Sequence, residues 1–262
     1  MALLAKLTAP RPSRVYARER LFTALDEARS RPAVWMHGPP GAGKTTLIAT
    51  YLTSRAIPFL WYQVDEGDGD IATFFYYFGL AATKVAARRK KPLPLFTPEF
   101  AHGVSAFARR YFQEFYSRIK PPFATVLDNY QDAPGDSALH EVIRHAIECA
   151  PPGVAIFAAS RAAPPPAFAR LRTNDAIEII DWEALRLTAD EAQSITRLRG
   201  GQELSADLLA RAEGWAAGIT LLLAGVGDLA AQSFESSTPQ QLFDYFAAEI
   251  FEKTDRKTQD FL

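Results

Sequence analysis

The chain has 262 residues, enough for one or two domains with a substantial core. Hydrophobic residues make up 48% and charged residues 23%, and the 15 Gly and 18 Pro are near ordinary usage, which excludes disordered, collagen-like and low-complexity proteins. The 29 Lys and Arg nearly balance the 30 Asp and Glu, so the net charge of -1 favours neither nucleic acid nor acidic membranes as partners of the whole chain.

The single cysteine and the lack of a recognisable targeting segment indicate a cytoplasmic protein. The single cysteine, Cys149, permits neither an internal disulfide nor a thiolate metal site. The N-terminus reaches Lys6 and then Pro10 too early for the apolar region of a signal peptide. The longest apolar run, from Ile219 to Val226, is far shorter than the ~18 residues that cross a bilayer. We therefore expect a protein of the reducing cytoplasm without a membrane-spanning helix.

Short apolar runs alternate with segments of helical spacing in the first two thirds of the chain. The runs are bounded by turn residues, as buried strands are, and their alternation with helices predicts a parallel sheet covered on both faces. The expected strands are 33–37, 59–64, 123–127, 154–159 and 176–180, and helices are expected over 18–29, 71–88, 104–119 and 139–149.

The pattern changes after Ile180, where only helical signals follow. Thr188 stands at a predicted helix N-cap with Glu191 three residues later, and Thr238 precedes a proline at a first helical position. We therefore expect an α/β domain over 1–181 and a small all-helical domain over 182–262. The chain stops inside an amphipathic pattern, which is typical of a piece of a larger protein, with a natural helical end as the alternative.

The clearest motif lies between the first predicted strand and a predicted helix. Residues 38–46 read GPPGAGKTT and match G-x-x-x-x-G-K-[ST] at every required position. In this pattern the glycine-rich backbone cradles phosphates, Lys44 reaches the β and γ phosphates, and the Thr45 hydroxyl binds Mg²⁺. An ordinary glycine-rich turn is the alternative. The expected phosphate-binding residues are Gly38, Pro39, Gly41, Ala42, Gly43, Lys44, Thr45 and Thr46.

Two further strand ends carry candidate site residues. Asp128 ends the strand 123–127 and is the candidate second residue of the magnesium site, although an Asp that only opens a turn is the alternative. Asn129 follows where many such ATPases have a second acid, and an amide takes up no proton near neutral pH, so hydrolysis should be slow unless Asp132 substitutes. Arg161 ends the strand 154–159 and is the candidate sensor of the γ-phosphate, with a plain surface arginine as the alternative.

Several stretches together resemble the STAND class of signal-transduction ATPases, in particular the maltose-regulator-like branch of the large LuxR-type transcription activators. Five segments carry this resemblance in order: GKTTL at 43–47, WYQVDE at 61–66 followed by Asp68 and Asp70, VLDNY at 126–130, ASR at 159–161 with ARLR at 169–172, and AEGWAAG at 212–218. They span most of residues 14–225.

The resemblance implies a P-loop NTPase fold with a parallel five-stranded sheet and an ATP/ADP switch that controls oligomerisation. In full-length relatives a winged helix, superhelical sensor repeats and often a DNA-binding domain follow, so residues 182–262 would run into a truncated winged-helix region. Tyr16 and Arg18 resemble the element that contacts the adenine side. Two departures stand out: Asn129 replaces a common Asp, and Ala216 replaces a Pro near the nucleotide.

Other conspicuous residues are better explained by ordinary structure. The basic block 88–91 falls at a predicted helix C-terminus, where cations are solvated and complement the dipole. His140 and His145 are five residues apart and so do not share a helix face for metal binding. Aromatic residues such as Trp61 and the cluster 74–78 could stack an adenine, but in parallel-sheet proteins they usually fill the core.

The sequence favours a regulatory module that binds ATP, ADP and Mg²⁺, hydrolyses ATP weakly and self-associates in the ATP state. A multiple-turnover ATPase of metabolism or nucleic-acid remodelling is the alternative, and a fast, substrate-stimulated rate would support it. Asn129 and the lack of a recognisable substrate site argue against that alternative. A nucleotide-independent scaffold is the third interpretation, and the complete motif at 38–46 opposes it.

Overall fold

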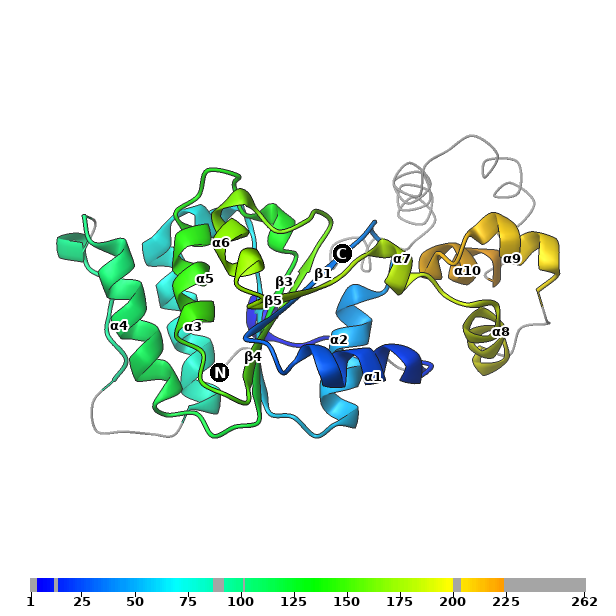
Figure 1. The fold of residues 1–262 in the computed structure, drawn as a ribbon, viewed down its shortest axis with the longest axis horizontal. Coiled ribbons are helices and arrows are strands. Elements are labelled where there is room, and N and C mark those ends of the chain that lie inside the picture. Colours follow the sequence, from blue (N-terminus) through cyan, green and yellow to red (C-terminus); the bar gives the residue numbers. More distant parts are fainter. Residues whose placement is uncertain (1–3, 12–13, 87–91, 101, 200–203, 224–262) are drawn as a thin grey trace. The chain divides into compact units, whose positions relative to one another are not determined.

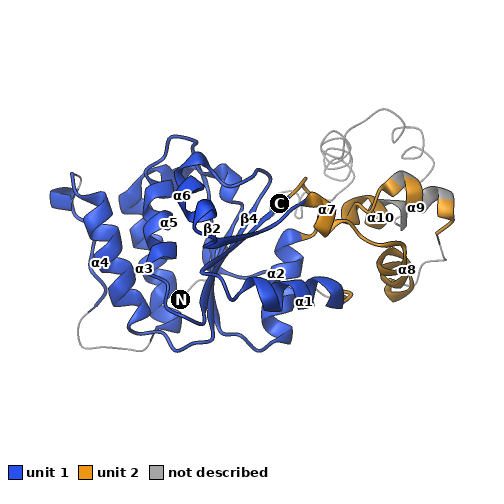
Figure 2. Cartoon of the chain, in the orientation of Figure 1, with its two compact units in different colours: residues 1–13, 17–37, 44–181 blue, residues 14–16, 38–43, 182–262 orange. Residues whose placement is uncertain are grey.

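The computed structural model describes residues 4–11, 14–86, 92–100, 102–199 and 204–223. Two compact units make up the chain, and Figure 2 shows them in different colours. The first contains residues 1–13, 17–37 and 44–181, and the second contains residues 14–16, 38–43 and 182–262. The basic block 88–91 and the predicted cap at Thr238 lie outside the described residues.

The first unit is built on a five-stranded sheet in the order β2-β3-β4-β1-β5, and every neighbouring pair is parallel. This confirms the predicted parallel sheet. Strand β4 lies between β1 and β3, so the ends of these three strands meet at one edge. The strands are β1 (Ala33–His37), β2 (Phe59–Gln63), β3 (Phe123–Asp128), β4 (Val154–Ser160) and β5 (Ile177–Ile180).

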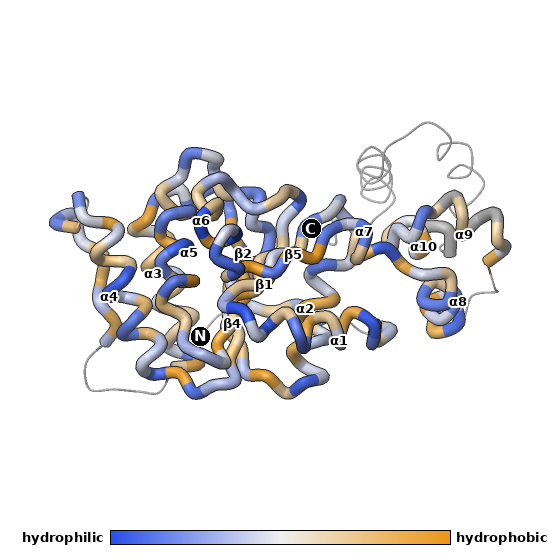
Figure 3. The backbone as a smooth tube through the Cα atoms, in the orientation of Figure 1, coloured by the Kyte–Doolittle hydropathy of each residue, from blue (hydrophilic) through white to orange (hydrophobic). Residues whose placement is uncertain are grey.

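Helices cover both faces of this sheet (Figure 1). Helices α1 (Glu19–Ala28) and α2 (Lys44–Ser54) lie on one face, and α3 (Ile71–Val85), α4 (Val104–Tyr116), α5 (Leu139–Glu148) and α6 (Ala169–Thr173) lie on the other. Because both faces are covered, all residues of β3 and β4 are buried, which explains their continuous apolar sequence. Along the helices hydrophobic and hydrophilic residues alternate (Figure 3).

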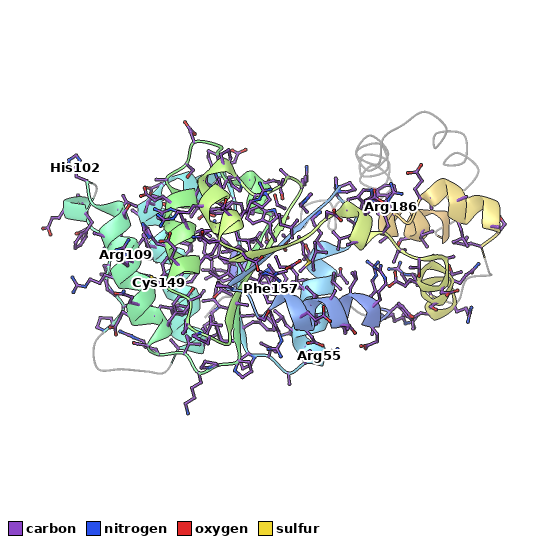
Figure 4. All side chains as sticks on the ribbon, viewed as in Figure 1. Arg55, His102, Arg109, Cys149, Phe157 and Arg186 are labelled. Carbon is purple, nitrogen blue, oxygen red and sulfur yellow. The ribbon has the colours of Figure 1, made fainter. Side chains whose placement is uncertain are left out.

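Two side-chain clusters hold the helices in place. On the α3 face, buried aromatic rings of Phe75, Phe78, Tyr111 and Phe112 interlock, so the aromatic residues of α3 fill the core. On the α1 face, Arg55 at the end of α2 bonds Asp26 of α1 and is labelled in Figure 4. The side chain of the free Cys149, also labelled there, lies 4.0 Å from the backbone oxygen of Arg109.

The described helices of the second unit are α7 (Trp182–Leu185), α8 (Ala189–Leu198), α9 (Ala206–Ala212) and α10 (Ala216–Leu223). Thr188 caps α8 as predicted: its hydroxyl accepts from the Glu191 amide at 3.2 Å, and the Glu191 carboxylate accepts from the Thr188 amide at 3.1 Å. Leu187, Ala192 and Ile219 form part of a small apolar core in this unit. Within the described part of the chain, no helix has both the length and the apolar character that a membrane span requires.

Short 3-10 turns connect several of these elements. Among them are η1 (Ala5–Leu7) and η2 (Glu66–Gly69), which are joined by the Lys6–Asp68 ion pair, and η4 (Tyr130–Asp132), which lies beside the site. Turn η4 follows the last residue of β3 through Asn129, whose backbone is left-handed with φ 56°. Asn and Asp adopt that conformation more readily than other side chains, because they can bond their own backbone.

Candidate phosphate-binding site

The predicted phosphate loop connects β1 to α2, and helix α2 begins at Lys44. Gly41 and Gly43 have positive φ angles of 70° and 85°, a region that side chains with a Cβ disfavour. The Ala42 amide donates to the Pro39 oxygen at 3.3 Å and closes the turn. Alternating left-handed and ordinary residues produce a concave backbone whose amides bind anions. The glycines of the motif therefore have a conformational role in this loop.

Thr45 and Asp128 meet at the start of α2. The Thr45 hydroxyl donates to Oδ1 of Asp128 at 2.9 Å, and the Asn129 amide donates to the same oxygen at 3.1 Å. Asp128 is 6% exposed, and burial raises the pKa of its carboxyl, an effect that the Thr45 hydrogen bond opposes. A hydroxyl and a carboxylate side by side are hard oxygen ligands suited to Mg²⁺.

Lys44 experiences an environment that disfavours its positive charge. Burial is the largest cause, and the nearby positive charge of Arg161 adds to it, so the pKa of Lys44 falls to about 8 although Asp128 opposes the change. A phosphate beside this ammonium would add negative charge to that of Asp128 and favour the charged form of Lys44. The electrostatics of Lys44 therefore fit a bound anion.

The end of β4 is joined to the turn after β3. The Arg161 amide donates to Oε1 of Gln131 at 3.0 Å, and Nε2 of Gln131 donates to Asp132 at 3.1 Å. The side chain of Arg161 is exposed. The sequence did not single out Gln131. The signal that could have identified it is a polar residue shortly after Asp128, in the turn that follows the strand end.

Lys44, Thr45, Asp128 and Arg161 thus come together in the first unit, where α2 begins and β3 and β4 end. Thr46 lies in the first turn of α2, and its backbone oxygen accepts from the Thr50 hydroxyl at 2.7 Å. The other expected residues are placed differently. Tyr16 is half-buried in the second unit, and Arg18 is buried, 8% exposed, just before α1 in the first. Their role on the adenine side stays a prediction.

The loop residues Gly38–Gly43 belong to the second unit, whereas the sequence placed the whole motif in the first domain. Hydrogen bonds explain the difference. The Trp215 indole Nε1 donates to the Pro40 oxygen at 2.8 Å, and the Ala217 amide donates to the Gly41 oxygen at 3.0 Å. The division between the units therefore runs through the motif itself, between Gly43 and Lys44.

The histidines that the sequence set aside have structural partners. His140 is buried, and its Nδ1 lies 3.0 Å from the Tyr130 hydroxyl. His145 is buried and pairs with Glu148 on the same helix at 3.0 Å. Among the described residues there is no group of three or more His, Cys, Asp and Glu side chains that could hold a metal. A Mg²⁺ ion bound by Thr45 and Asp128 would therefore take its other ligands from phosphate and water.

The chain is similar to known proteins in sequence and in fold. No family model matches the chain. The whole chain is 29% identical over 287 residues to the HTH-type transcriptional regulator MalT of Vibrio parahaemolyticus, and 27% identical over 275 residues to that of Yersinia pestis. The chain spans 30% of the length of these relatives.

A solved structure shares the fold. It is a STAND (signal transduction ATPase with numerous domains) protein with a tetratricopeptide repeat sensor from Pyrococcus horikoshii. The TM-score is 0.57 at 16% identity, over 96% of this chain and 34% of that one. The chain is therefore similar along its whole length to MalT-type transcriptional regulators, and it shares the fold of a STAND protein.

Proposed function

We propose that this chain is the ATP- and ADP-binding switch module of a bacterial transcription regulator. The observation that carries the proposal is the Thr45–Asp128 hydrogen bond of 2.9 Å beside Lys44. The Thr45 hydroxyl, the buried Asp128 carboxylate and the Lys44 ammonium, whose pKa burial lowers, lie at a glycine-rich loop. These three groups suit a polyphosphate with its magnesium ion. An ordinary turn would need none of these three groups.

Each site residue then has a role. The amides of Gly41 and Gly43 and the Lys44 side chain hold the phosphates, Thr45 and Asp128 hold Mg²⁺, and Arg161 contacts the γ-phosphate. Mg²⁺, when bound, neutralises charge on the β and γ phosphates. Tyr16 and Arg18 are proposed for the adenine side. The Gln131 bond to the Arg161 amide, 3.0 Å long, supports the role of Arg161 because it ties the end of β4 to the turn beside Asp128.

Hydrolysis in this module should be slow. Asn129 follows Asp128 directly, and its amide side chain cannot accept a proton from an attacking water. The Asp132 carboxylate accepts from the Nε2 of Gln131 at 3.1 Å, so it is bonded to another side chain of the same turn. A module that binds ATP tightly and hydrolyses it slowly persists in one nucleotide state long enough to act as a switch.

The wider role is inferred from the relatives. They are transcription regulators more than three times as long as this chain, which spans 30% of their length. We infer that sensor and DNA-binding domains accompany this module in the full protein, that the protein is cytoplasmic, and that ATP favours self-association. The energy for such a change comes from contacts that differ between the ATP and ADP states.

Calorimetry on wild type and Lys44→Ala tests the proposal. Wild type should bind ADP and ATP in the presence of Mg²⁺, and Lys44→Ala should abolish binding, because the only lysine of the motif is gone. Lys84→Ala, which removes an exposed lysine of α3, is the matched control and should bind like wild type. Absence of binding by wild type, or unchanged affinity in Lys44→Ala, would contradict the proposal.

Mass spectrometry of nucleotide released from denatured protein separates a switch from a turnover enzyme. Retained ADP indicates a switch that holds its product, and this is the expected result. A fast multiple-turnover ATPase rate together with an empty site after purification would contradict the switch. Calorimetry and mass spectrometry are both carried out on the 262-residue chain.

A further inference from the structure

A short segment of the second unit donates two hydrogen bonds to the phosphate loop. We call residues 214–218 the brace; it joins α9 to the first turn of α10. Trp215, 1% exposed, donates its indole N–H to the Pro40 oxygen at 2.8 Å, and the Ala217 amide donates to the Gly41 oxygen at 3.0 Å. All of these residues belong to the second compact unit.

These two bonds fix the direction of two consecutive peptide groups. A trans peptide is planar, and its C=O and N–H point in opposite directions. The Pro40 carbonyl shares its peptide group with the Gly41 amide, and the Gly41 carbonyl shares one with the Ala42 amide. Because both carbonyls point at the brace, both amides point away from it. Hydrogen bonding at the carbonyl also polarises the amide, which makes it a better donor.

The small residues of the brace and of the loop fit this contact. A Cβ at Gly41 would lie 2.4 Å from the Ala217 Cβ and 3.0 Å from the Trp215 indole nitrogen. A Cβ at Gly218 would lie 2.7 Å from the Trp215 ring. Gly214 has φ +74°, and its carbonyl accepts from the Leu187 amide at 2.8 Å. Packing thus holds the Trp215 ring in the orientation in which its N–H reaches Pro40.

We propose that the brace is a positioning element for the phosphate loop. Trp215 and the Ala217 amide hold the two peptide groups that begin at Pro40 and Gly41, so that the Gly41 amide faces the bound phosphates and the Ala42 amide closes the turn onto the Pro39 oxygen. Nucleotide affinity therefore depends on the brace being docked. This inference rests on the proposed nucleotide binding. Because coupling between two equilibria is reciprocal, bound nucleotide must in turn stabilise docking of the brace. Trp215 is a positioning residue and touches no phosphate itself.

The test compares Trp215→Phe with Trp35→Phe. Both variants keep an aromatic ring and lose one indole N–H bond to a backbone oxygen, since Trp35 donates to the Ala162 oxygen at 3.0 Å in the first unit. Calorimetric titration with ADP and with MgATP gives the affinities, and urea unfolding gives the stability of each variant. We expect Trp215→Phe to bind both nucleotides about 3- to 10-fold more weakly than wild type, and Trp35→Phe to bind within about 2-fold.

A spectroscopic readout separates positioning from a loss of stability. Adding ADP should change tryptophan emission in wild type and in Trp35→Phe. Trp215→Phe should lose most of that change, because Trp215 is the indole whose N–H bonds the loop, and Trp182, which lies near Gly38, accounts for what remains. If Trp215→Phe does not fold, Ala217→Pro takes its place: it removes the second donor at a first-turn position, where proline is tolerated. The same weakening is expected.

The outcomes distinguish the two proposals. Normal binding by wild type with unchanged affinity in Trp215→Phe or Ala217→Pro overturns the brace and leaves the proposed nucleotide binding standing. Absence of binding by wild type overturns the proposed function and this inference together. If Trp215→Phe and Trp35→Phe lose nucleotide affinity to the same extent, the brace is also overturned, because the effect would then not be specific to the loop.

Discussion

The Thr45 hydroxyl and the Asp128 carboxylate, 83 residues apart in the chain, are joined by a hydrogen bond of 2.9 Å. One belongs to the first turn of α2 and the other ends β3. Parallel strands bring their carboxyl ends to the same edge of the sheet, and the loop after β1 starts α2 at that edge. The topology therefore assembles a two-oxygen site from distant parts of the sequence.

Thr45→Val should remove the magnesium dependence of ATP binding. Valine keeps the shape of threonine and loses only the hydroxyl, so the phosphate-binding amides stay in place. The measured quantity is the ratio of the ATP affinity in Mg²⁺ to the ATP affinity in EDTA. We expect this ratio to fall by about 10-fold or more in Thr45→Val. Thr45→Ser keeps the hydroxyl and should keep the ratio. An equal magnesium effect in Thr45→Val and wild type would show that the hydroxyl is no ligand.

Nucleotide affinity should fall as pH rises through the pKa of Lys44. That pKa is about 8 in the free protein, chiefly because of burial, and a bound phosphate raises it. Well below pH 8 Lys44 is charged in both free and bound protein, so its titration leaves affinity unchanged. Above pH 8 binding must take up a proton, and affinity should drop by about 10-fold between pH 7 and pH 9.

The measurement is the dissociation constant of ADP across this pH range. Lys44→Arg is the control, because a guanidinium stays charged up to pH 12 and should give a flat profile even where its affinity is lower. An affinity that rises with pH in the wild-type protein would reverse the expected sign, and a profile as flat as that of the arginine variant would exclude Lys44 as the titrating group.

The strands could be read from the sequence because a parallel sheet covered on both faces needs continuous apolar runs. Strand β1 matches its predicted range, and β3 and β4 each extend by one residue, to Asp128 and Ser160. Those added residues are polar, so hydropathy alone ended the strands too early. The predicted helix 104–119 ends at Tyr116 instead, because a helical period shows which residues face the core but not where the last turn closes.

The long-range contacts could not be predicted from the sequence. Trp215 bonds the Pro40 oxygen across 175 residues, and nothing local in either segment specifies that partner. Lys6 likewise binds Asp68, 62 residues away. Such contacts depend on which elements become neighbours in space. A motif such as residues 38–46 is easier to read, because its chemistry lies within one turn.

Asn129→Asp should accelerate ATP hydrolysis. The backbone at Asn129 is left-handed, with φ 56° and ψ 39°, a conformation that aspartate adopts nearly as readily as asparagine, so the fold should accept the change. A carboxylate at this position can take a proton from water, and we expect the steady-state ATPase rate to rise by about 10-fold or more. The fold-loss in ADP affinity should be smaller than the fold-increase in the hydrolysis rate, because the added charge lies beyond the phosphate-binding amides.

Asn129→Gly separates the added base from relief of backbone strain. Glycine also suits a left-handed backbone and brings no carboxylate, so its rate should equal that of the wild-type protein. A rate increase in the glycine variant as large as in the aspartate variant would attribute the gain to loop flexibility and remove the reason for calling Asn129 the brake on hydrolysis.

Lys6→Met should destabilise the first unit. Asp68 of η2 is 0% exposed, and three donors surround its carboxylate: Lys6 at 2.8 Å, the Tyr62 hydroxyl at 2.6 Å and the Asp65 amide at 2.9 Å. Lys6 is the only cation among them, so methionine leaves a buried carboxylate without an opposite charge. We expect the free energy of unfolding in urea to drop by about 3 kcal/mol.

A double variant tests that cause. Lys6→Met combined with Asp68→Asn has no buried charge to compensate, so it should recover much of the stability that Lys6→Met loses. Lys84→Met, at an exposed position of α3, should change the unfolding free energy by less than about 0.5 kcal/mol. The alternative outcome is that the double variant loses as much unfolding free energy as the two single variants together. In that case Lys6 stabilises by packing over the Tyr62 ring, 5.1 Å from its centroid, and the ion pair with Asp68 contributes little.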